Sequence, residues 1–317
     1  MNILVAGAAG FVGSHLCDYL LAQGHSVLGV DSLITGSTRN LDAAKCSKRF
    51  EFRHLDITDE KFAISVADRE FSHIVNLASP ASPDDFSRIP DQILRVGSIG
   101  TLNLLDLAVE RGARCIFASS SEVYGEPEVH PQHESYRGSV DTTGPRSCYD
   151  EAKRFGEAAV TTYGRHHGLS FGVIRIFNTY GPRMQAGDGR VVSNFIHASL
   201  RSEPLSIYGS GSQTRSFCYV SDLVRGITAV MEYESDIIVN LGNPEEVTIL
   251  SLAETVIKSV NSTSQIITNP MPEGRFGDPT RRRPDISKAM SLLGWSPEIS
   301  LEEGLRRYLL SLTDTTI

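Results

Sequence analysis

Apolar and polar residues follow two periods along the first half of the chain. Short β-branched runs predict strands at 3–5, 27–30, 74–77 and 115–118, and amphipathic stretches predict helices at 14–23 and 101–110. A further strand is expected at 171–177, and helices at 222–232, 249–260 and 301–311. This alternation of strands and helices predicts an α/β fold with a doubly wound parallel sheet.

The amino-acid composition of the sequence changes after the strand at 171–177. Loops rich in Gly, Pro, Arg and Asn follow, including YGPRMQAGDGR and YGSGSQTRSF. Such loops often face ligands, and no repeat or linker separates the two halves. We expect one large domain at 1–177, with later contributions from about 215–242, and a smaller C-terminal α/β lobe at 178–317 that mainly binds substrate.

Composition narrows the class of protein. With 317 residues and 40% hydrophobic content the chain can bury a large core, and a net charge of -8 disfavours a nucleic-acid partner. No apolar run approaches the roughly 18 residues of a membrane span, and the N-terminus lacks a basic leader, so we expect a cytoplasmic protein. Scattered, odd-numbered cysteines predict reduced thiols and no metal site: Cys17, Cys46, Cys115, Cys148 and Cys218.

A glycine-rich loop follows the first predicted strand and opens the first helix. Glycines there let the backbone approach a pyrophosphate at the helix N-terminus, although a tight turn with packing glycines explains the spacing equally well. Asp31 ends the second strand, where a carboxylate can bind ribose hydroxyls and repel a 2′-phosphate. The pair therefore favours NAD over NADP and an NAD-binding Rossmann domain at 1–177. The loop comprises Gly7, Gly10, Phe11, Val12 and Gly13.

Two further strand ends are candidates for cofactor contacts. Asp56 and Ile57 could flank the adenine, and Leu77, Ala78 and Ser79 could lie along the cofactor. An Asp at a strand end is more commonly a helix cap or turn residue, so that alternative stays open.

Tyr149 and Lys153 stand four residues apart, on one face of a predicted helix. A nearby cation favours the phenolate, so Tyr149 could act as a base near neutral pH while Lys153 holds a nicotinamide ribose. A Tyr and a Lys at this spacing occur by chance in many helices. Here, however, a strand ending in SSSEVYG precedes them, after the glycine loop and Asp31.

The motifs GxxGxxG, SSSEVYG, YDEAK and RIFNTYGPR together resemble the extended short-chain dehydrogenase/reductases, which include sugar-nucleotide epimerases, dehydratases and decarboxylases. Longer stretches, such as NLASPASP, RSCYDEAKR and QTRSFCYVSDLV, resemble the UDP-glucuronate decarboxylases over essentially the whole chain. The resemblance implies an NAD-dependent carboxy-lyase that converts UDP-glucuronate to UDP-xylose. It also implies a 4-keto intermediate and internal recycling of NAD.

The resemblance also assigns roles to individual residues. Ser120, Tyr149 and Lys153 act on the sugar 4-hydroxyl, Glu122 and Arg282 work near C5 and C6, and Arg183 lies near the cofactor. A homodimer through the helices at 101–110 and 149–166 is implied as well. The substrate side comprises Pro80, Glu122, Asn178, Arg190, Val191, Tyr208, Arg215 and Arg282. Whether the nucleotide is uridine or thymidine stays open.

Ser121 helps to choose among the relatives. The resembling 4,6-dehydratases have an Asp before Glu122 that protonates a departing 6-hydroxyl, and a serine is a poor acid for that step. A 4-epimerase or 4,6-dehydratase is the nearest alternative. A non-catalytic NAD-binding protein is a remote one, because Tyr149 and Lys153 are both present.

Two positions depart from the family pattern. Ser32 stands where an Asn usually follows the ribose-binding Asp, and 96–98 reads Val-Gly-Ser in place of Thr-Asn-Val. Gly97 is expected to weaken its helix by about 1 kcal/mol relative to alanine.

Overall fold

The computed structural model describes residues 1–187, 189–270 and 281–313. Seven strands form one sheet in the order β11-β6-β5-β4-β1-β2-β3, and every neighbouring pair is parallel. A parallel sheet covered on both faces needs nearly continuous apolar strands, and all seven residues of β5 are buried. The strands are β1 (Asn2–Ala6), β2 (Ser26–Asp31), β3 (Phe50–His54), β4 (His73–Asn76), β5 (Arg114–Ser120), β6 (Phe171–Ile176) and β11 (Ile237–Leu241).

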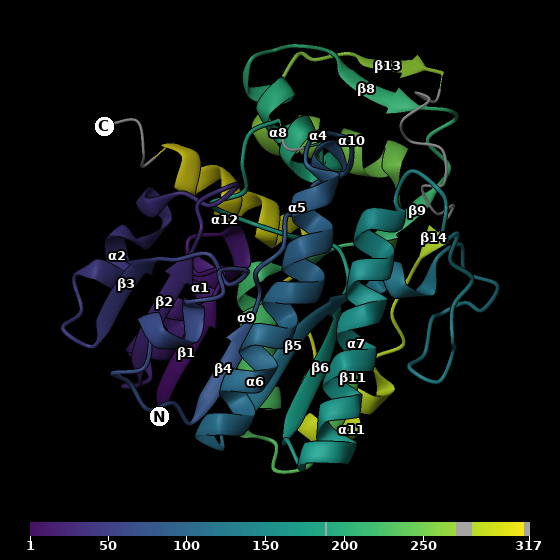
Figure 1. Ribbon diagram of the computed structural model, residues 1–317. Helices are drawn as coiled ribbons and strands as arrows, with labels where there is room; N and C mark the ends of the chain where they lie inside the picture. The colour runs from purple at the N-terminus through teal and green to yellow at the C-terminus, as the bar shows by residue number, and fades with distance from the viewer. Residues whose placement is uncertain (188, 271–280, 314–317) are drawn as a thin grey trace.

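Helices cover both faces of this sheet (Figure 1). On one face α5 (Pro90–Arg95) and α6 (Thr101–Arg111) follow one another end to end and α7 (Ser147–His167) lies beside them, while α1 (Phe11–Ala22) and α9 (Val220–Glu232) cover the other. Each face has its own buried apolar cluster. The predicted doubly wound α/β fold is confirmed. In the described ranges, none of the helices has the length and apolar character needed to cross a membrane.

The strand order reverses direction at β1, which lies between β2 and β4. In such sheets ligands bind at the carboxyl ends of the strands near this switch point. Above that edge lie α8 (Val191–Leu200), α10 (Ile249–Val260) and the paired strands β8 (Leu205–Tyr208) and β13 (Ile266–Asn269), as Figure 1 shows.

Small strands and helices complete the fold. A three-stranded sheet, in the order β12-β9-β14, brings residues from the last third of the chain to the same edge. The remaining elements are β7 (Thr179–Tyr180), β9 (Thr214–Ser216), β10 (Cys218–Tyr219), β12 (Glu246–Thr248), β14 (Arg281–Arg282), η1 (Thr38–Leu41), α2 (Asp42–Lys45), α3 (Phe62–Ser65), α4 (Pro83–Arg88), η3 (Ser121–Tyr124), α11 (Ser287–Leu293) and α12 (Leu301–Thr313).

The segment with the unusual Val-Gly-Ser run forms a π-helical turn, η2 (Val96–Gly100), between α5 and α6. A Cβ on Gly97 would lie 2.5 Å from the Cβ of Ala152 on α7. Gly97 thus has a packing role that its low helix propensity did not reveal, because it lets η2 press against the helix that carries Tyr149 and Lys153.

Candidate active site

A cavity of about 1220 Å³ opens at the carboxyl edge of the sheet, beneath α8 and β8. Pockets for one small ligand usually span about 300–1,000 Å³, so this volume suits two ligands side by side. Most of the predicted site residues line it: Gly7, Gly10, Phe11, Val12, Gly13, Leu77, Ser79, Ser120, Glu122, Tyr149, Lys153, Asn178, Arg183, Arg190, Val191, Tyr208, Arg215 and Arg282.

Five predicted site residues lie outside the cavity lining: Asp31, Asp56, Ile57, Ala78 and Pro80. The Asp31 carboxylate accepts the backbone N–H groups of Ala9 and Leu33 at 2.9 and 2.8 Å. Asp56 accepts both the N–H and the hydroxyl of Thr58 at 2.8 Å, which is the turn role left open by the sequence. Contacts of these five residues with ligands stay predictions.

The glycine loop fits a dinucleotide. It connects β1 to α1. The N-cap residue of α1 is Gly10, which has no side chain that could bond to the first N–H groups of the helix. The first N–H groups of the helix are therefore available to an anion. A Cβ on Gly13 would lie 2.0 Å from the carbonyl oxygen of Gly7, so no larger residue fits at this close approach.

Arg183 supplies a cation near the glycine loop. One of its terminal nitrogens, Nη2, pairs with the Asp18 carboxylate at 2.6 Å, whereas Nη1 is buried and has no hydrogen-bond partner in the described part of the chain. A buried guanidinium donor on the cavity wall suits a phosphate oxygen. Together, the loop and Arg183 match the diphosphate of NAD.

The first turns of α7 bring Tyr149 and Lys153 to the cavity. The Lys153 Nζ donates to the Ala118 carbonyl at 2.9 Å and lies 5.5 Å from the centre of the Tyr149 ring. Burial lowers the pKa of Lys153 to about 8. The Ser120 hydroxyl bonds to Tyr149 and also accepts the Glu122 N–H, so it both reaches the tyrosine and caps a turn.

The expectation of a phenolate near neutral pH is not met by these contacts. Burial is the largest influence on Tyr149 and raises its pKa to about 12, although the hydrogen bond from Ser120 opposes the rise. Lys153 donates to a backbone carbonyl and lies over the face of the Tyr149 ring. Tyr149 is thus protonated until a ligand changes its surroundings.

Glu122 lies between two guanidinium groups. Its Oε2 is 2.8 Å from Nη2 of Arg146 and 3.2 Å from Nη2 of Arg282. The other terminal nitrogen of Arg282, Nη1, donates to the Ser121 carbonyl at 2.8 Å. Burial disfavours the charged carboxylate, but Arg282, Arg146 and Arg215 outweigh it and hold its pKa well below the usual range. The wall therefore carries one carboxylate and two paired cations.

Arg146 and Phe86 line the cavity but were missed in the sequence. Phe86, on α4, stacks on the Tyr149 ring with centroids 4.9 Å apart, and the Arg146 guanidinium lies 5.2 Å from the Phe86 centroid. The available signal for Arg146 was its position three residues before Tyr149, one helical turn away. The Phe86 contact joins segments far apart in the chain and had no such signal.

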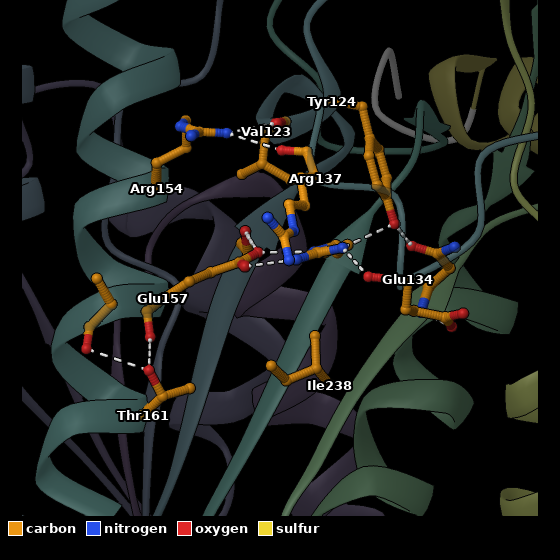
Figure 2. Close-up of polar contacts among 12 residues, drawn as sticks. Val123, Tyr124, Glu134, Arg137, Arg154, Glu157, Thr161 and Ile238 are labelled. Atoms are coloured by element: carbon orange, nitrogen blue, oxygen red, sulfur yellow. Dashed lines mark hydrogen bonds and ion pairs between the residues drawn. The ribbon is translucent and has the colours of Figure 1, made fainter. Parts of the chain in front are cut away.

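A network of hydrogen bonds behind β5, the strand that ends at Ser120, connects α7 to the sheet. Arg175 on β6 pairs with both oxygens of Glu157 at 2.9 and 2.7 Å and donates to the Tyr124 hydroxyl at 3.0 Å. Ser119, next to Ser120, donates to Glu157 at 2.6 Å. Figure 2 shows Glu157 and Tyr124 on opposite sides of this network. It fixes the end of β5 against the helix that carries Lys153.

A family model described as the NAD dependent epimerase/dehydratase family matches residues 3–242 of the chain. The chain belongs to the NAD-dependent epimerase/dehydratase family. Within this family it is 50% identical to UDP-glucuronic acid decarboxylase 1 of Danio rerio, over 96% of the chain and 71% of the relative. It is 48% identical to UDP-glucuronic acid decarboxylase 6 of Arabidopsis thaliana, over 96% of the chain and 87% of the relative.

Solved structures of epimerases in the family share the fold. UDP-glucose 4-epimerase from Thermotoga maritima, with UDP-glucose, superimposes with a TM-score of 0.92 at 31% identity and full coverage of both chains. UDP-glucuronic acid 4-epimerase from Bacillus cereus, solved with UDP-glucuronic acid and NAD, gives 0.88 at 28% identity, covering 99% of this chain and 100% of that one. The predicted family resemblance and NAD dependence are confirmed.

Proposed function

We propose that this protein decarboxylates UDP-glucuronate to UDP-xylose and recycles its NAD within one catalytic cycle. The observation that carries the proposal is the wall formed by Glu122, Arg146 and Arg282, which has one positive charge in excess beside Tyr149. A buried excess cation stabilises a sugar that bears a carboxylate. The names of the relatives and of the uronate epimerase support the same substrate.

The chemistry follows from the placement of the side chains. Tyr149, ionised once NAD and the substrate occupy the site, takes the proton of the 4-hydroxyl, and the Ser120 hydroxyl, which bonds to Tyr149, positions that oxygen. NAD held by the glycine loop, Lys153 and Arg183 would supply the acceptor for the hydride of C4 and would return it at the end of the cycle. The carboxylate is then β to a ketone, so the C5–C6 bond breaks with its electrons delocalised onto the 4-oxygen. Tyr149, now neutral, stabilises that oxygen by donating a hydrogen bond.

The rest of the cavity divides between the two ligands. The glycine loop, Leu77, Ser79, Lys153 and Arg183 hold NAD, and Asp31, Asp56, Ile57 and Ala78 support that side. The nucleotide of the substrate lies toward Pro80, Asn178, Arg190, Val191, Tyr208 and Arg215. In this division residues 1–177, with about 215–242, bind NAD, and the rest of 178–317 mainly binds the nucleotide sugar.

The active form is a homodimer. Helices α5 and α6 run end to end on one face of the sheet with α7 beside them (Figure 1), and this face exposes large apolar side chains that a second copy would cover. The exposed residues are Leu94, Ile99, Val109 and Phe155.

Incubation with UDP-glucuronate, with and without added NAD, tests the proposal by mass spectrometry of the product. We expect a nucleotide sugar lighter by one carbon dioxide, formed by the wild type and not by Tyr149→Phe. A product of unchanged mass with inverted C4 would make the protein a 4-epimerase, in line with its structural neighbours. Loss of water would make it a dehydratase. A parallel incubation with dTDP-glucuronate shows whether the protein uses the uridine or the thymidine nucleotide.

A further inference from the structure

Asp150 is a buried acid that the chemistry above does not use. It follows Tyr149 in the first turn of α7, and only 6% of its surface is exposed. Its Oδ1 is buried and accepts no hydrogen bond from any described residue. A buried carboxylate in which one oxygen has no donor is costly when ionised, so such residues are uncommon unless they serve a purpose.

Charged groups from three other segments act electrostatically on Asp150. Glu122 comes from η3, Arg146 precedes α7, and Arg282 comes from β14, while Glu151 is the neighbour on its own helix. Burial is the main reason that the pKa of Asp150 rises far above the ordinary 3.8, and repulsion by Glu122 adds to it. The two arginines oppose the rise without cancelling it. The phenol of Tyr149 and the thiol of Cys148, which can also lose a proton, adjoin Asp150, and burial raises the pKa of both groups.

The charges of this cluster can be counted. Ionised Glu122, Arg146 and Arg282 sum to one positive charge; Arg215, which also lowers the pKa of Glu122, is assigned above to the nucleotide and is balanced there by the diphosphate. An ionised Asp150 brings the sum to zero, and so does the carboxylate of a bound sugar beside a protonated Asp150. With both carboxylates ionised, the buried cluster would carry a net negative charge, which its surroundings disfavour.

We propose that Asp150 takes up a proton when the substrate carboxylate enters the site and gives one up as carbon dioxide leaves. The inference rests on the proposed function, because it needs a carboxylate on the sugar. Asp150 does not line the cavity, so it is a positioning residue that acts through the charge of Glu122, Arg146 and Arg282.

The proton balance of the reaction agrees with this role. Cleavage of the C5–C6 bond releases neutral carbon dioxide and leaves its electron pair on the enolate, and the new C5–H bond then consumes one proton. One proton released from Asp150 keeps the cluster and sugar neutral from substrate to product. The proton balance is the same whichever group transfers the proton from Asp150 to C5.

Calorimetric titration of the NAD-loaded Tyr149→Phe variant, which binds without turnover, measures proton uptake from the heats in buffers of different ionisation enthalpy. At pH about 8 Asp150 is largely ionised in spite of its raised pKa, so we expect the protein to take up almost one proton for each UDP-glucuronate bound. UDP-glucose, which has a hydroxyl in place of the carboxylate, should give almost none. Adding Asp150→Asn should abolish the uptake, and Glu151→Gln at the matched neighbour, whose charge acts only weakly on Asp150, should retain most of it.

The outcomes separate the two proposals. Uptake that persists in the Asp150→Asn background, or equal uptake with both sugars, overturns the role of Asp150. UDP-glucuronate that binds without proton uptake to the parent overturns it too and leaves the decarboxylase proposal standing. Failure of UDP-glucuronate to bind overturns both. Thermal melting and NAD binding of the Asn variant check its fold, and the comparison of the two sugars needs no variant at Asp150.

Discussion

Two arginines share one oxygen of Glu122, and this arrangement decides the charge of the site. Arg282 is 1% exposed and is anchored by the Ser121 carbonyl, whereas Arg146 lies at the cavity wall on the face of Phe86. Removing a cation from such a cluster changes both the charge of the site and the pKa of Glu122. Of the two, Arg146 is the more accessible to a ligand.

Replacing Arg146 with glutamine should weaken binding of the sugar carboxylate. We expect the KM for UDP-glucuronate to rise about tenfold to a hundredfold, because a charge-assisted contact contributes roughly 1.5–3 kcal/mol. Steady-state kinetics measures this effect. Inhibition by UDP-xylose, which has no carboxylate, should change by less than about threefold. An equal loss for both nucleotides would place Arg146 at the diphosphate instead.

At the scale of elements, α7 joins the chemistry to the sheet. Tyr149, Lys153 and Glu157 repeat at intervals of four residues on this helix, so they share one face. The first two line the cavity, and Glu157 is held by Arg175 behind it. The position of α7 against η2 and β6 therefore sets the position of the catalytic pair.

Gly97→Ala should displace α7. The new Cβ would come within 2.5 Å of the Ala152 Cβ, and overpacking of this kind costs about 1–3 kcal/mol. We expect a lower unfolding free energy and a kcat reduced by about tenfold, because a small misplacement of catalytic groups is costly. Adding Ala152→Gly should restore both, and a double variant no better than Gly97→Ala would show that the contact is not the cause.

The Arg175–Glu157 pair should stabilise the protein only as a pair. Both side chains are nearly buried, so Glu157→Met leaves an uncompensated guanidinium and should cost about 3–5 kcal/mol in urea unfolding. The double variant Arg175→Met/Glu157→Met should lose less than this single variant. A double variant that loses more would mean that the network in Figure 2 contributes beyond the compensation of its charges.

At the scale of the whole molecule, the sequence predicted the layers of the fold but not the walls of the site. β1 and β5 each contain an apolar run, at 3–6 and 115–118, and the loop of Gly7, Gly10 and Gly13 must follow the first strand, so local pattern was sufficient there. Glu122 and Arg146 are joined only because a long loop returns to the first turn of α7. Such contacts depend on tertiary packing, which local periodicity does not encode.

The apolar face of α5, α6 and α7 predicts the assembly of the molecule. Phe155→Glu places a charge on a face that a second copy would bury, so we expect a shift from dimer to monomer in sedimentation velocity at micromolar concentration. Met290→Glu changes an exposed apolar residue on α11 and serves as the control. A wild type that sediments as a monomer would contradict the dimer.

The central claim is that the sugar loses its carboxylate through a 4-keto intermediate and is then protonated at C5. Turnover of UDP-glucuronate in deuterium oxide, followed by mass spectrometry and NMR of the product, tests this claim most directly. We predict UDP-xylose with one deuteron at C5 and none at C4, because the C4 hydrogen returns from the cofactor. A product that keeps its carboxylate, or UDP-xylose without deuterium at C5, would contradict the account.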